Sequence, residues 1–421
     1  MDFKDFDLIR NLQEAINDIG YKTPTPIQQK AIPIILNEKD LVGTAQTGTG
    51  KTGAFAIPII NYLHRLVSNS KRTKRIRTLV LTPTRELAIQ IAENFDTYAK
   101  YTKIKTLVIF GGVSQVSQVN TLKEGTDVLV ATPGRLLDLH KQGFIDLNHL
   151  HHLVLDEADL MLDMGFINDV KKVIKLTPEN RQTLLFSATM PIAIRELADN
   201  FLNNPEYVSV APVSSASEIV TQKVYLVEKE NKRKLLLHII QTQQLKNVLI
   251  FTRTKGGANN VAKFLQKNNI TAEAIHGDKS QNARQRALNS FKNNEIDILV
   301  ATDVASRGID IDLLPYVINY DLPNVPETYV HRIGRTGRAG NEGIAISFCG
   351  RDEKNYLQNI EKLIRKKIKV VSDNPFPWQE NPPKSLSEKP QNPPKKDFRN
   401  KNKSNNSRKS TNSKKNKRRW Y

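Results

Sequence analysis

The chain has 421 residues, with 63 Lys and Arg against 43 Asp and Glu and a formal net charge of +20. This length predicts two or three domains with a sizeable hydrophobic core. A single cysteine, Cys349, excludes a disulfide framework and a cysteine-based zinc cluster, and it favours a reducing, cytoplasmic location. The charged residues 1–6 predict no signal peptide, and the chain contains no run of 18 apolar residues that would predict a membrane span.

The apolar runs alternate with helical stretches along the chain. Runs of this length and composition are typical of strands buried on both faces of a parallel sheet. In the first half they are 77–81, 106–110, 128–130, 153–155 and 183–186. In the second half they are 224–227, 248–251, 298–300, 316–318 and 344–348. The sequence therefore predicts an α/β protein built on parallel sheets.

Residues 211–217 interrupt this pattern with small, polar and proline residues, as expected of a linker. The segment Asp127–Thr132 (DVLVAT) is also matched 170 positions later by Asp297–Thr302 (DILVAT). We therefore expect two related domains. Their predicted bounds are 1–210 and 219–370, with a linker at 211–218 and a tail at 371–421.

The positive charge is concentrated in that tail. Residues 380–421 contain 14 Lys and Arg but only 3 Asp and Glu, and Leu386 is their only aliphatic residue. Such a segment cannot bury enough apolar surface to fold, so we expect it to be disordered. We interpret it as a basic arm that binds nucleic-acid phosphates. The alternative is a solubilising tail without a partner.

A glycine-rich loop follows the short apolar pair Leu41–Val42. The loop, Ala45–Thr52 (AQTGTGKT), leads into a helical stretch from Gly53 to about Val67, and strand–loop–helix is the context that a phosphate-binding loop needs. Lys51 is expected to reach the β- and γ-phosphates of a nucleotide, and the Thr52 hydroxyl to bind Mg²⁺. The strict pattern has Gly where this chain has Ala45. An accidental Gly/Thr-rich turn is the alternative.

We expect only one such nucleotide site. The turn in what we take as the equivalent place of the second half is 251–257, and it contains no Gly-Lys-Ser/Thr.

Two further motifs contain charged residues that could act on a nucleotide. Asp156 and Glu157 come directly after the run 153–155, so they stand at the carboxyl end of the sheet, where α/β proteins bind ligands. Asp156 suits a Mg²⁺ ligand and Glu157 a general base that activates water. The alternative is an acidic helix N-terminus that complements the helix dipole.

The second motif is His331–Arg338 (HRIGRTGR), whose arginines are spaced three apart. Arginine fingers offered to a nucleotide in the first half would explain this cluster. The alternative is a basic nucleic-acid patch.

Taken together, these motifs and their order resemble the DEAD-box ATP-dependent RNA helicases of helicase superfamily 2. The resemblance covers about residues 1–370, and the segment Asp156–Phe166 is most similar to the bacterial RhlE-type group. It implies two RecA-like domains, with ATP and Mg²⁺ as cofactors and RNA as the partner. No motif is missing and no catalytic position is replaced.

The resemblance also implies roles for individual residues, all numbered in this sequence. The residues implied in ATP binding are Phe3, Tyr21, Gln28, Gln46, Thr47, Gly48, Thr49, Gly50, Lys51, Thr52, Asp156, Gly308 and Asp310, with Thr52 and Asp156 as metal ligands. The implied catalytic residues are Lys51, Glu157, Arg335 and Arg338. The residues implied in coupling hydrolysis to unwinding or in closure are Ser187, Thr189, His331 and Arg332. The implied RNA contacts are Arg85, Gly112, Thr132, Arg135, Arg253, Lys255, Gln281, Arg284, Thr302 and Asp303.

The expected function is therefore ATP-dependent unwinding of short RNA duplexes, with RNA held mainly by its backbone. An ATP-gated RNA clamp or annealing platform is the first alternative, and a DNA helicase the second. Ribosome assembly, mRNA decay and cold-induced unfolding are all compatible settings.

Overall fold

The computed structural model describes residues 2–46, 48–68, 75–210, 220–303, 311, 314–337 and 343–378. The expected linker at 211–218 lies outside these residues, as does most of the expected tail. We call residues 2–210 the first half and residues 220–378 the second half. None of the helices in the described ranges is both long and apolar enough to cross a membrane.

The first half is built on a seven-stranded parallel sheet with the strand order β3-β4-β2-β5-β6-β1-β7. Its strands are β1 (Leu41–Thr44), β2 (Thr78–Leu81), β3 (Thr106–Ile109), β4 (Val128–Ala131), β5 (His152–Leu155), β6 (Gln182–Ser187) and β7 (Glu206–Ser209). Its helices are η1 (Phe3–Asp5), α1 (Arg10–Asp18), α2 (Pro26–Leu36), α3 (Lys51–Ser68), α4 (Arg85–Tyr98), α5 (Val116–Glu124), α6 (Pro133–Lys141), α7 (Ala158–Asp163), α8 (Ile167–Ile174) and α9 (Ile192–Phe201).

The second half repeats this architecture with the parallel order β10-β11-β9-β12-β13-β8-β14. Its strands are β8 (Val220–Leu226), β9 (Val248–Thr252), β10 (Ala272–Ile275), β11 (Ile298–Thr302), β12 (Tyr316–Asn319), β13 (Gly343–Cys349) and β14 (Lys369–Val370). Its helices are η2 (Lys229–Asn231), α11 (Lys232–Thr242), α12 (Lys255–Lys267), α13 (Gln281–Lys292), α15 (Pro326–Ile333), η3 (Arg351–Glu353) and α16 (Lys354–Ile364). The predicted α/β class with two parallel-sheet domains is confirmed.

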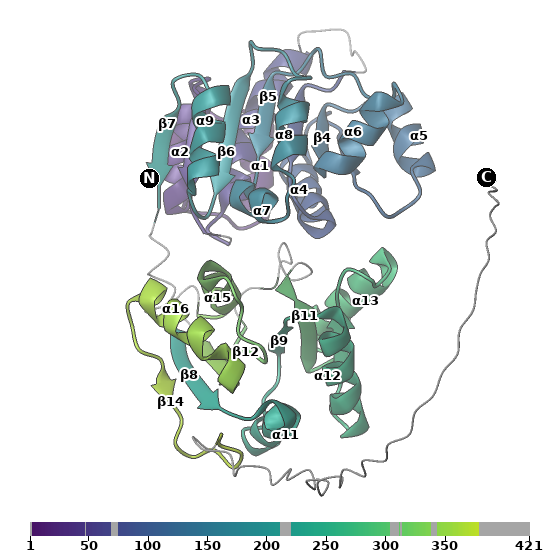
Figure 1. Cartoon of the computed structure of the whole chain (residues 1–421). Coiled ribbons are helices and arrows are strands. Elements are labelled where there is room, and N and C mark those ends of the chain that lie inside the picture. The colour runs from purple at the N-terminus through teal and green to yellow at the C-terminus, as the bar shows by residue number, and fades with distance from the viewer. Residues whose placement is uncertain are drawn as a thin grey trace, which may run out of the picture. The chain divides into compact units, whose positions relative to one another are not determined.

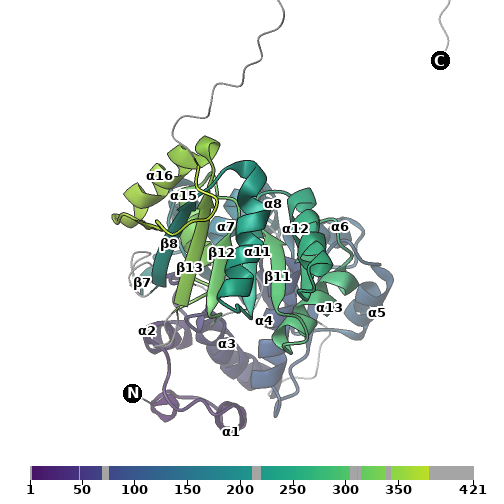
Figure 2. The ribbon, with the colours of Figure 1, turned by 90° about the horizontal axis from the view of Figure 1, so that it is seen from below.

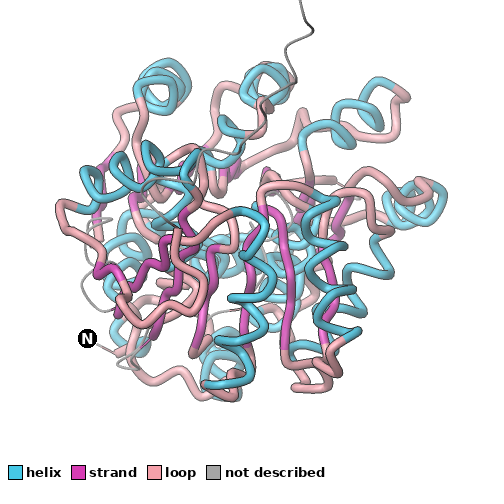
Figure 3. Tube along the Cα trace, turned by 60° about the horizontal axis from the view of Figure 1, so that its bottom comes forward, coloured by secondary structure: helices cyan, strands magenta, loops and turns pink. Residues whose placement is uncertain are grey.

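Helices cover both faces of each sheet (Figures 1 and 3). In the first sheet, α2, α3 and α4 pack on one face, and α6, α8 and α9 pack on the other. In the second sheet, α11 and α12 lie across one face, as Figure 2 shows, while α13, α15 and α16 cover the opposite face. Successive residues of β9 alternate between these faces, since Val248 and Ile250 pack in one core and Leu249 and Phe251 in the other. Burial on both faces explains why the strands are continuous apolar runs.

The two sheets are built in the same chain order as well as the same spatial order. The echoing segments 127–132 and 297–302 contain β4 and β11, and each of these strands is the second in its sheet. The expectation that 251–257 is the counterpart of the phosphate loop is wrong. That segment begins in the last two residues of β9, which occupies the place of β2. The counterpart of β1 is β8, so the equivalent segment is 227–231.

Candidate functional site

The phosphate loop connects β1 to α3. Gly48 and Gly50 have φ values of 79° and 93°, which side chains rarely adopt. A Cβ on Gly50 would also lie 2.8 Å from the Gln28 amide nitrogen. The Ala45 N–H donates to the Ser187 carbonyl at 3.0 Å, which extends the pairing of β1 with β6. Ala45 is buried directly after β1 and has no positive φ, so the alanine at this position fits.

Lys51, the first residue of α3, forms a buried ion pair with Glu157. Its Nζ lies 2.8 Å from Glu157 Oε1 and also donates to the Ala45 carbonyl at 3.0 Å. Both side chains are about 5% exposed. Burial alone lowers the pKa of Lys51, but the charges of Glu157 and Asp156 outweigh it, so the pKa is raised. Lys51 therefore keeps its positive charge in this buried position.

Asp156 lies beside this pair at the end of β5. Burial raises its pKa to about 7, although the Lys51 ammonium opposes the rise. Its Oδ1 is buried and has no hydrogen-bond partner among the described residues. A carboxylate oxygen without a donor suits a hard cation such as Mg²⁺, which usually binds through one or two carboxylates and substrate phosphates. The residues present thus fit the expected metal, with Thr52 half-buried at the second position of α3.

Gln28, one of the expected ATP-binding residues, is connected to the phosphate loop. Gln28 accepts a hydrogen bond from the Thr25 N–H at 2.9 Å and donates one to the Gly50 carbonyl at 3.1 Å. Phe3 is buried and its ring stacks on Tyr21, with ring centroids 6.3 Å apart. Tyr21 remains 41% exposed. The structure thus places Gln28 directly against the loop, with an exposed aromatic ring on the same half.

The remaining loop residues include Gln46, which is half-buried, and Thr49, whose hydroxyl donates to the Gln46 carbonyl at 2.7 Å. Thr47 lies outside the described residues, as do the predicted site residues Gly308, Asp310 and Arg338.

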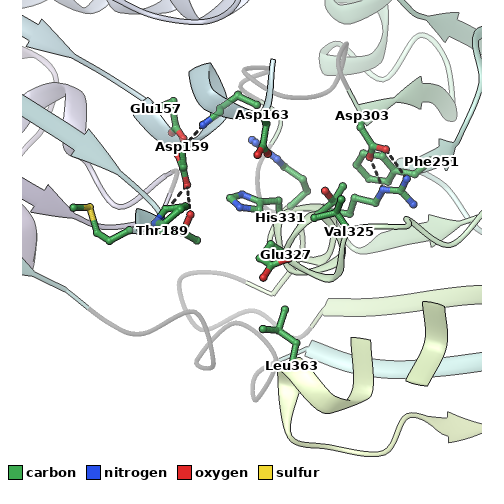
Figure 4. Close-up of a pocket in the computed structure, with 16 residues that line it drawn as sticks. Glu157, Asp159, Asp163, Thr189, Phe251, Asp303, Val325, Glu327, His331 and Leu363 are labelled. Carbon is green, nitrogen blue, oxygen red and sulfur yellow. Dashed lines mark hydrogen bonds and ion pairs between the residues drawn. The ribbon is translucent and has the colours of Figure 1, made fainter. Parts of the chain in front are cut away.

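The acidic motif is tied to the segment that follows β6. Asp159 Oδ2 accepts hydrogen bonds from the N–H and the hydroxyl of Thr189, each at 2.9 Å (Figure 4). The Asp159 N–H donates to the Ser187 hydroxyl at 3.2 Å. These three hydrogen bonds join the start of α7 to the end of β6, the two segments that contain the residues expected to couple hydrolysis to unwinding.

A cavity of about 420 Å³ brings the acidic motif together with the arginine cluster. The first half contributes Glu157, Asp159 and Thr189, and the second half contributes His331, Arg332 and Arg335. Figure 4 shows His331 and Glu327 projecting from α15 toward this space. Arg335 is buried, at 6% exposure.

Arg332 has a structural role within the second half. Its guanidinium forms two bonds to the Asp303 carboxylate at 2.6 and 2.8 Å, and it donates to Asn319 Oδ1 at 3.1 Å and to the Asp321 carbonyl at 2.7 Å. It also lies over the Phe251 ring. Asp303, which we expected to contact RNA, is thus held by an arginine.

The predicted RNA contacts of the first half gather at the carboxyl ends of β2, β3 and β4. Arg85 packs on Gly112, where a Cβ would lie 2.1 Å from the guanidinium, so only glycine allows this approach. Thr132 directly precedes α6, and Arg135 donates to the Val113 carbonyl at 2.9 Å.

In the second half, the predicted RNA contacts are engaged with acidic side chains. Gln281 and Arg284 both contact the Glu86 carboxylate of the first half, each at 3.0 Å. Lys255 pairs with Asp278 at 2.6 Å. Thr302 ends β11 and is buried.

Comparison with known proteins decides what this arrangement is. The DEAD/DEAH box helicase model matches residues 25–197, and the helicase conserved C-terminal domain matches residues 231–340. RhpA of Helicobacter pylori, a DEAD-box ATP-dependent RNA helicase, is 42% identical over 368 residues, which are 87% of this chain and 73% of that protein. CshA of Geobacillus kaustophilus is 43% identical over 366 residues, 87% of this chain and 77% of that one. The chain belongs to the DEAD-box ATP-dependent RNA helicases.

Solved structures of DEAD-box proteins agree. The DEAD box protein from Methanococcus jannaschii is 39% identical, with a TM-score of 0.51 over 88% of this chain and 99% of that one. Dbp5 of S. cerevisiae, bound to RNA and ADP BeF3, is 30% identical, with a TM-score of 0.76 over 88% and 95% of the two chains. The chain is thus an ATP-dependent RNA helicase with two RecA-like domains, and its ATP hydrolysis is stimulated by RNA. These relatives do not specify the RhlE-type group, so that narrower assignment stays a prediction.

Two acidic residues of this DEAD-box helicase escaped the sequence analysis. Glu86 directly follows Arg85, an expected RNA contact, and this neighbouring acid was the available signal. Glu353 is 2% exposed and binds Lys232 and Arg253, whose nitrogens lie 2.7 and 2.6 Å from its oxygens. No sequence pattern marks it.

Proposed function

We propose that the buried Lys51–Glu157 ion pair forms in the ATP site when no nucleotide is bound. We further propose that ATP binding gives Lys51 a new partner. The observation that supports this is the 2.8 Å ion pair beside Asp156, whose Oδ1 lacks a hydrogen-bond donor among the described residues. A γ-phosphate next to Lys51 would replace the carboxylate as its partner. Glu157 would then be released to accept a proton from the attacking water.

Thr52 and Asp156 would hold Mg²⁺, and the ion would neutralise charge on the phosphates. Arg335 and Arg338 would stabilise the charge that develops on the γ-phosphate, with His331 and Arg332 supporting closure of the two domains, 1–210 and 219–370. Gln28, with Tyr21 and Phe3, would select adenine, and Gly308 and Asp310 would complete the nucleotide site. Ser187 and Thr189, through Asp159, would transmit hydrolysis to RNA.

RNA would be held by its phosphates and 2′-hydroxyls at the carboxyl edges of both sheets, with little base preference. The contacts would come from the following residues: Arg85, Gly112, Thr132, Arg135, Arg253, Lys255, Gln281, Arg284, Thr302 and Asp303. Local bending of one strand would separate a short duplex, and hydrolysis would release it.

Strand displacement on a short RNA duplex, with and without ATP, tests this proposal. We expect displacement to require ATP, and ATP hydrolysis to be stimulated by RNA more than by matched DNA. Stimulation by DNA as strong as by RNA would contradict the proposed 2′-hydroxyl contacts.

We propose that the tail, 371–421, is an auxiliary RNA-binding arm. Its support is the excess of 14 basic over 3 acidic residues in 380–421. Deletion of 380–421 should weaken RNA binding and flatten its salt dependence while leaving ATP binding unchanged. ATP-independent annealing that disappears with the tail would favour the annealing platform for this segment. Crosslinking RNA to the full-length and tail-less chains in cells would decide between ribosome assembly, mRNA decay and other cytoplasmic settings.

A further inference from the structure

The second half contains a counterpart of the Lys51–Glu157 pair. Strands β1 and β8 occupy the same place in their sheets, and the helices that follow them begin at Lys51 and Lys232. Both lysines are buried, at 5% and 3% exposure. Strands β5 and β12 also correspond, and an acid that follows each of them pairs with the lysine. Lys232 Nζ lies 3.1 Å from Asp321 Oδ1.

The connection before Lys232 cannot cradle a phosphate. Residues 227–231 contain no glycine and include Glu228 and Glu230. Lys232 instead contacts a second acid, the Glu353 carboxylate, whose Oε2 accepts from Lys232 at 2.7 Å and from the Gly350 N–H at 3.0 Å.

The other oxygen of this carboxylate faces an RNA-contact candidate. Glu353 Oε1 accepts from Arg253 Nη2 at 2.6 Å and from the Leu322 N–H at 3.1 Å. The same Arg253 nitrogen donates to the Leu322 carbonyl at 3.0 Å, and the guanidinium lies 5.2 Å from the centre of the Tyr356 ring. Within the part of the chain that the structure describes, Nε and Nη1 of Arg253 have no acceptor, and the side chain is 40% exposed. Its outward donors are therefore available in a fixed orientation.

We infer that Glu353 is a built-in anion that replaces the phosphate of a lost nucleotide site and positions Arg253 for the RNA backbone. This inference rests on the proposed role of Arg253 in RNA binding. A free arginine side chain loses rotamer entropy when it binds, and holding it in place before RNA arrives reduces that loss. Glu353 acts through Arg253 and touches no substrate itself.

The sign of the effect distinguishes positioning from simple charge. Glu353→Gln removes a negative charge near a predicted RNA site, so electrostatics alone would strengthen RNA binding. If Glu353 positions Arg253, the variant should instead bind RNA more weakly. The RNA concentration for half-maximal ATPase activity should rise about fivefold, while ATP affinity and the ATPase rate at saturating RNA stay unchanged. Asp278→Asn is the matched control, because Asp278 pairs with Lys255 at 2.6 Å but is 64% exposed. It should leave RNA affinity unchanged or raise it up to about threefold.

Arg253→Ala separates this inference from the function on which it rests. We expect it to weaken RNA binding about tenfold, and Glu353→Gln to add little in the Arg253→Ala background. If Arg253→Ala leaves RNA affinity unchanged, the assigned RNA contact is wrong. If Arg253→Ala weakens binding but Glu353→Gln does not, the positioning role is wrong. Should Glu353→Gln fail to fold, Tyr356→Leu loosens the same guanidinium. An unchanged RNA affinity in that variant would overturn the inference equally.

Discussion

The variant Glu157→Gln tests whether Glu157, which is paired with Lys51 in this structure, is the catalytic base. Glutamine keeps the shape of the side chain and an oxygen that can accept from Lys51 at the observed 2.8 Å. It loses the negative charge and the ability to take a proton from water. A general base contributes about 10²- to 10⁴-fold, so we expect the RNA-stimulated ATPase rate to fall by that factor.

Binding should respond in the opposite way to turnover. Lys51 no longer has to leave a carboxylate when the γ-phosphate arrives, so ATP affinity should be retained or increased. Removing one partner of a buried ion pair costs about 3–5 kcal/mol, but the remaining hydrogen bond and the nearby Asp156 charge offset part of this. We expect the free energy of unfolding to fall by about 2 kcal/mol.

A second buried ion pair supplies the matched control. Arg77 and Asp127 are 2.6 Å apart and about 5% exposed, and they lie at the amino ends of β2 and β4, away from the phosphate loop. Asp127→Asn should lower the free energy of unfolding at least as much, yet leave the ATPase rate per folded molecule unchanged.

The assays are urea unfolding, titration with a fluorescent ATP analogue, and steady-state ATPase at saturating RNA. Hydrolysis by Glu157→Gln at the parent rate would refute the assignment of the base. A variant that cannot bind ATP would instead show that Glu157 serves to hold Lys51 in place.

Three further predictions concern Gly50, Thr189 and His152. Gly50→Ala should weaken ATP binding at least about tenfold, because φ is 93° and the new Cβ would lie 2.8 Å from the Gln28 amide; unchanged ATP titration would contradict it. Thr189→Val keeps the backbone bond to Asp159 but loses the 2.9 Å hydroxyl bond, so strand displacement should fall more than RNA-stimulated ATPase. Burial lowers the pKa of His152 to about 3 from 6.5, so the unfolded chain binds the extra proton between these values and stability falls as the pH drops through that window. His152→Gln should remove up to about 3 kcal/mol of this pH dependence, as measured by urea unfolding from pH 7 to pH 4.

The sequence predicts the inner strands better than the outer ones. Inner strands are buried on both faces and appear as continuous apolar runs. The unpredicted strands β7, β10 and β14 all lie at the ends of the two sheets. An end strand has only one neighbour, so it tolerates exposed polar residues; β7, Glu206–Ser209, has a single buried residue, Val208. Such a strand exists because its backbone pairs with the sheet, which no side-chain pattern reports.

The candidate site divides in a similar way. Residues in the connection after a strand or at the start of the next helix, such as Asp156, Glu157 and Lys51, can be placed from sequence, since parallel strands bring their carboxyl ends to one edge. Contacts between charged residues that are far apart in the sequence cannot be placed in this way. Glu86 meets Arg284 across almost two hundred positions, and Glu353 meets Arg253 across a hundred. In the sequence alone, neither Glu86 nor Glu353 can be distinguished from an acidic residue at a solvated helix end.

The relation between Lys51 and Lys232 shows why duplication is hard to see in the sequence. The echo of β4 in β11 has an offset of 170 residues, and applying it to Lys51 gives position 221, inside β8. The loop lengths of the two halves differ, so one offset cannot align all their strands, and only the shared strand order identifies Lys232 as the counterpart. Both lysines are held by acids at the same edge of the sheet. In the first half the anion that completes the site is expected to be a nucleotide, which comes and goes. In the second half it is Glu353, which is permanent. One architecture thus provides a site that can switch and a site that is fixed, and the fixed site is the one that holds a candidate RNA contact.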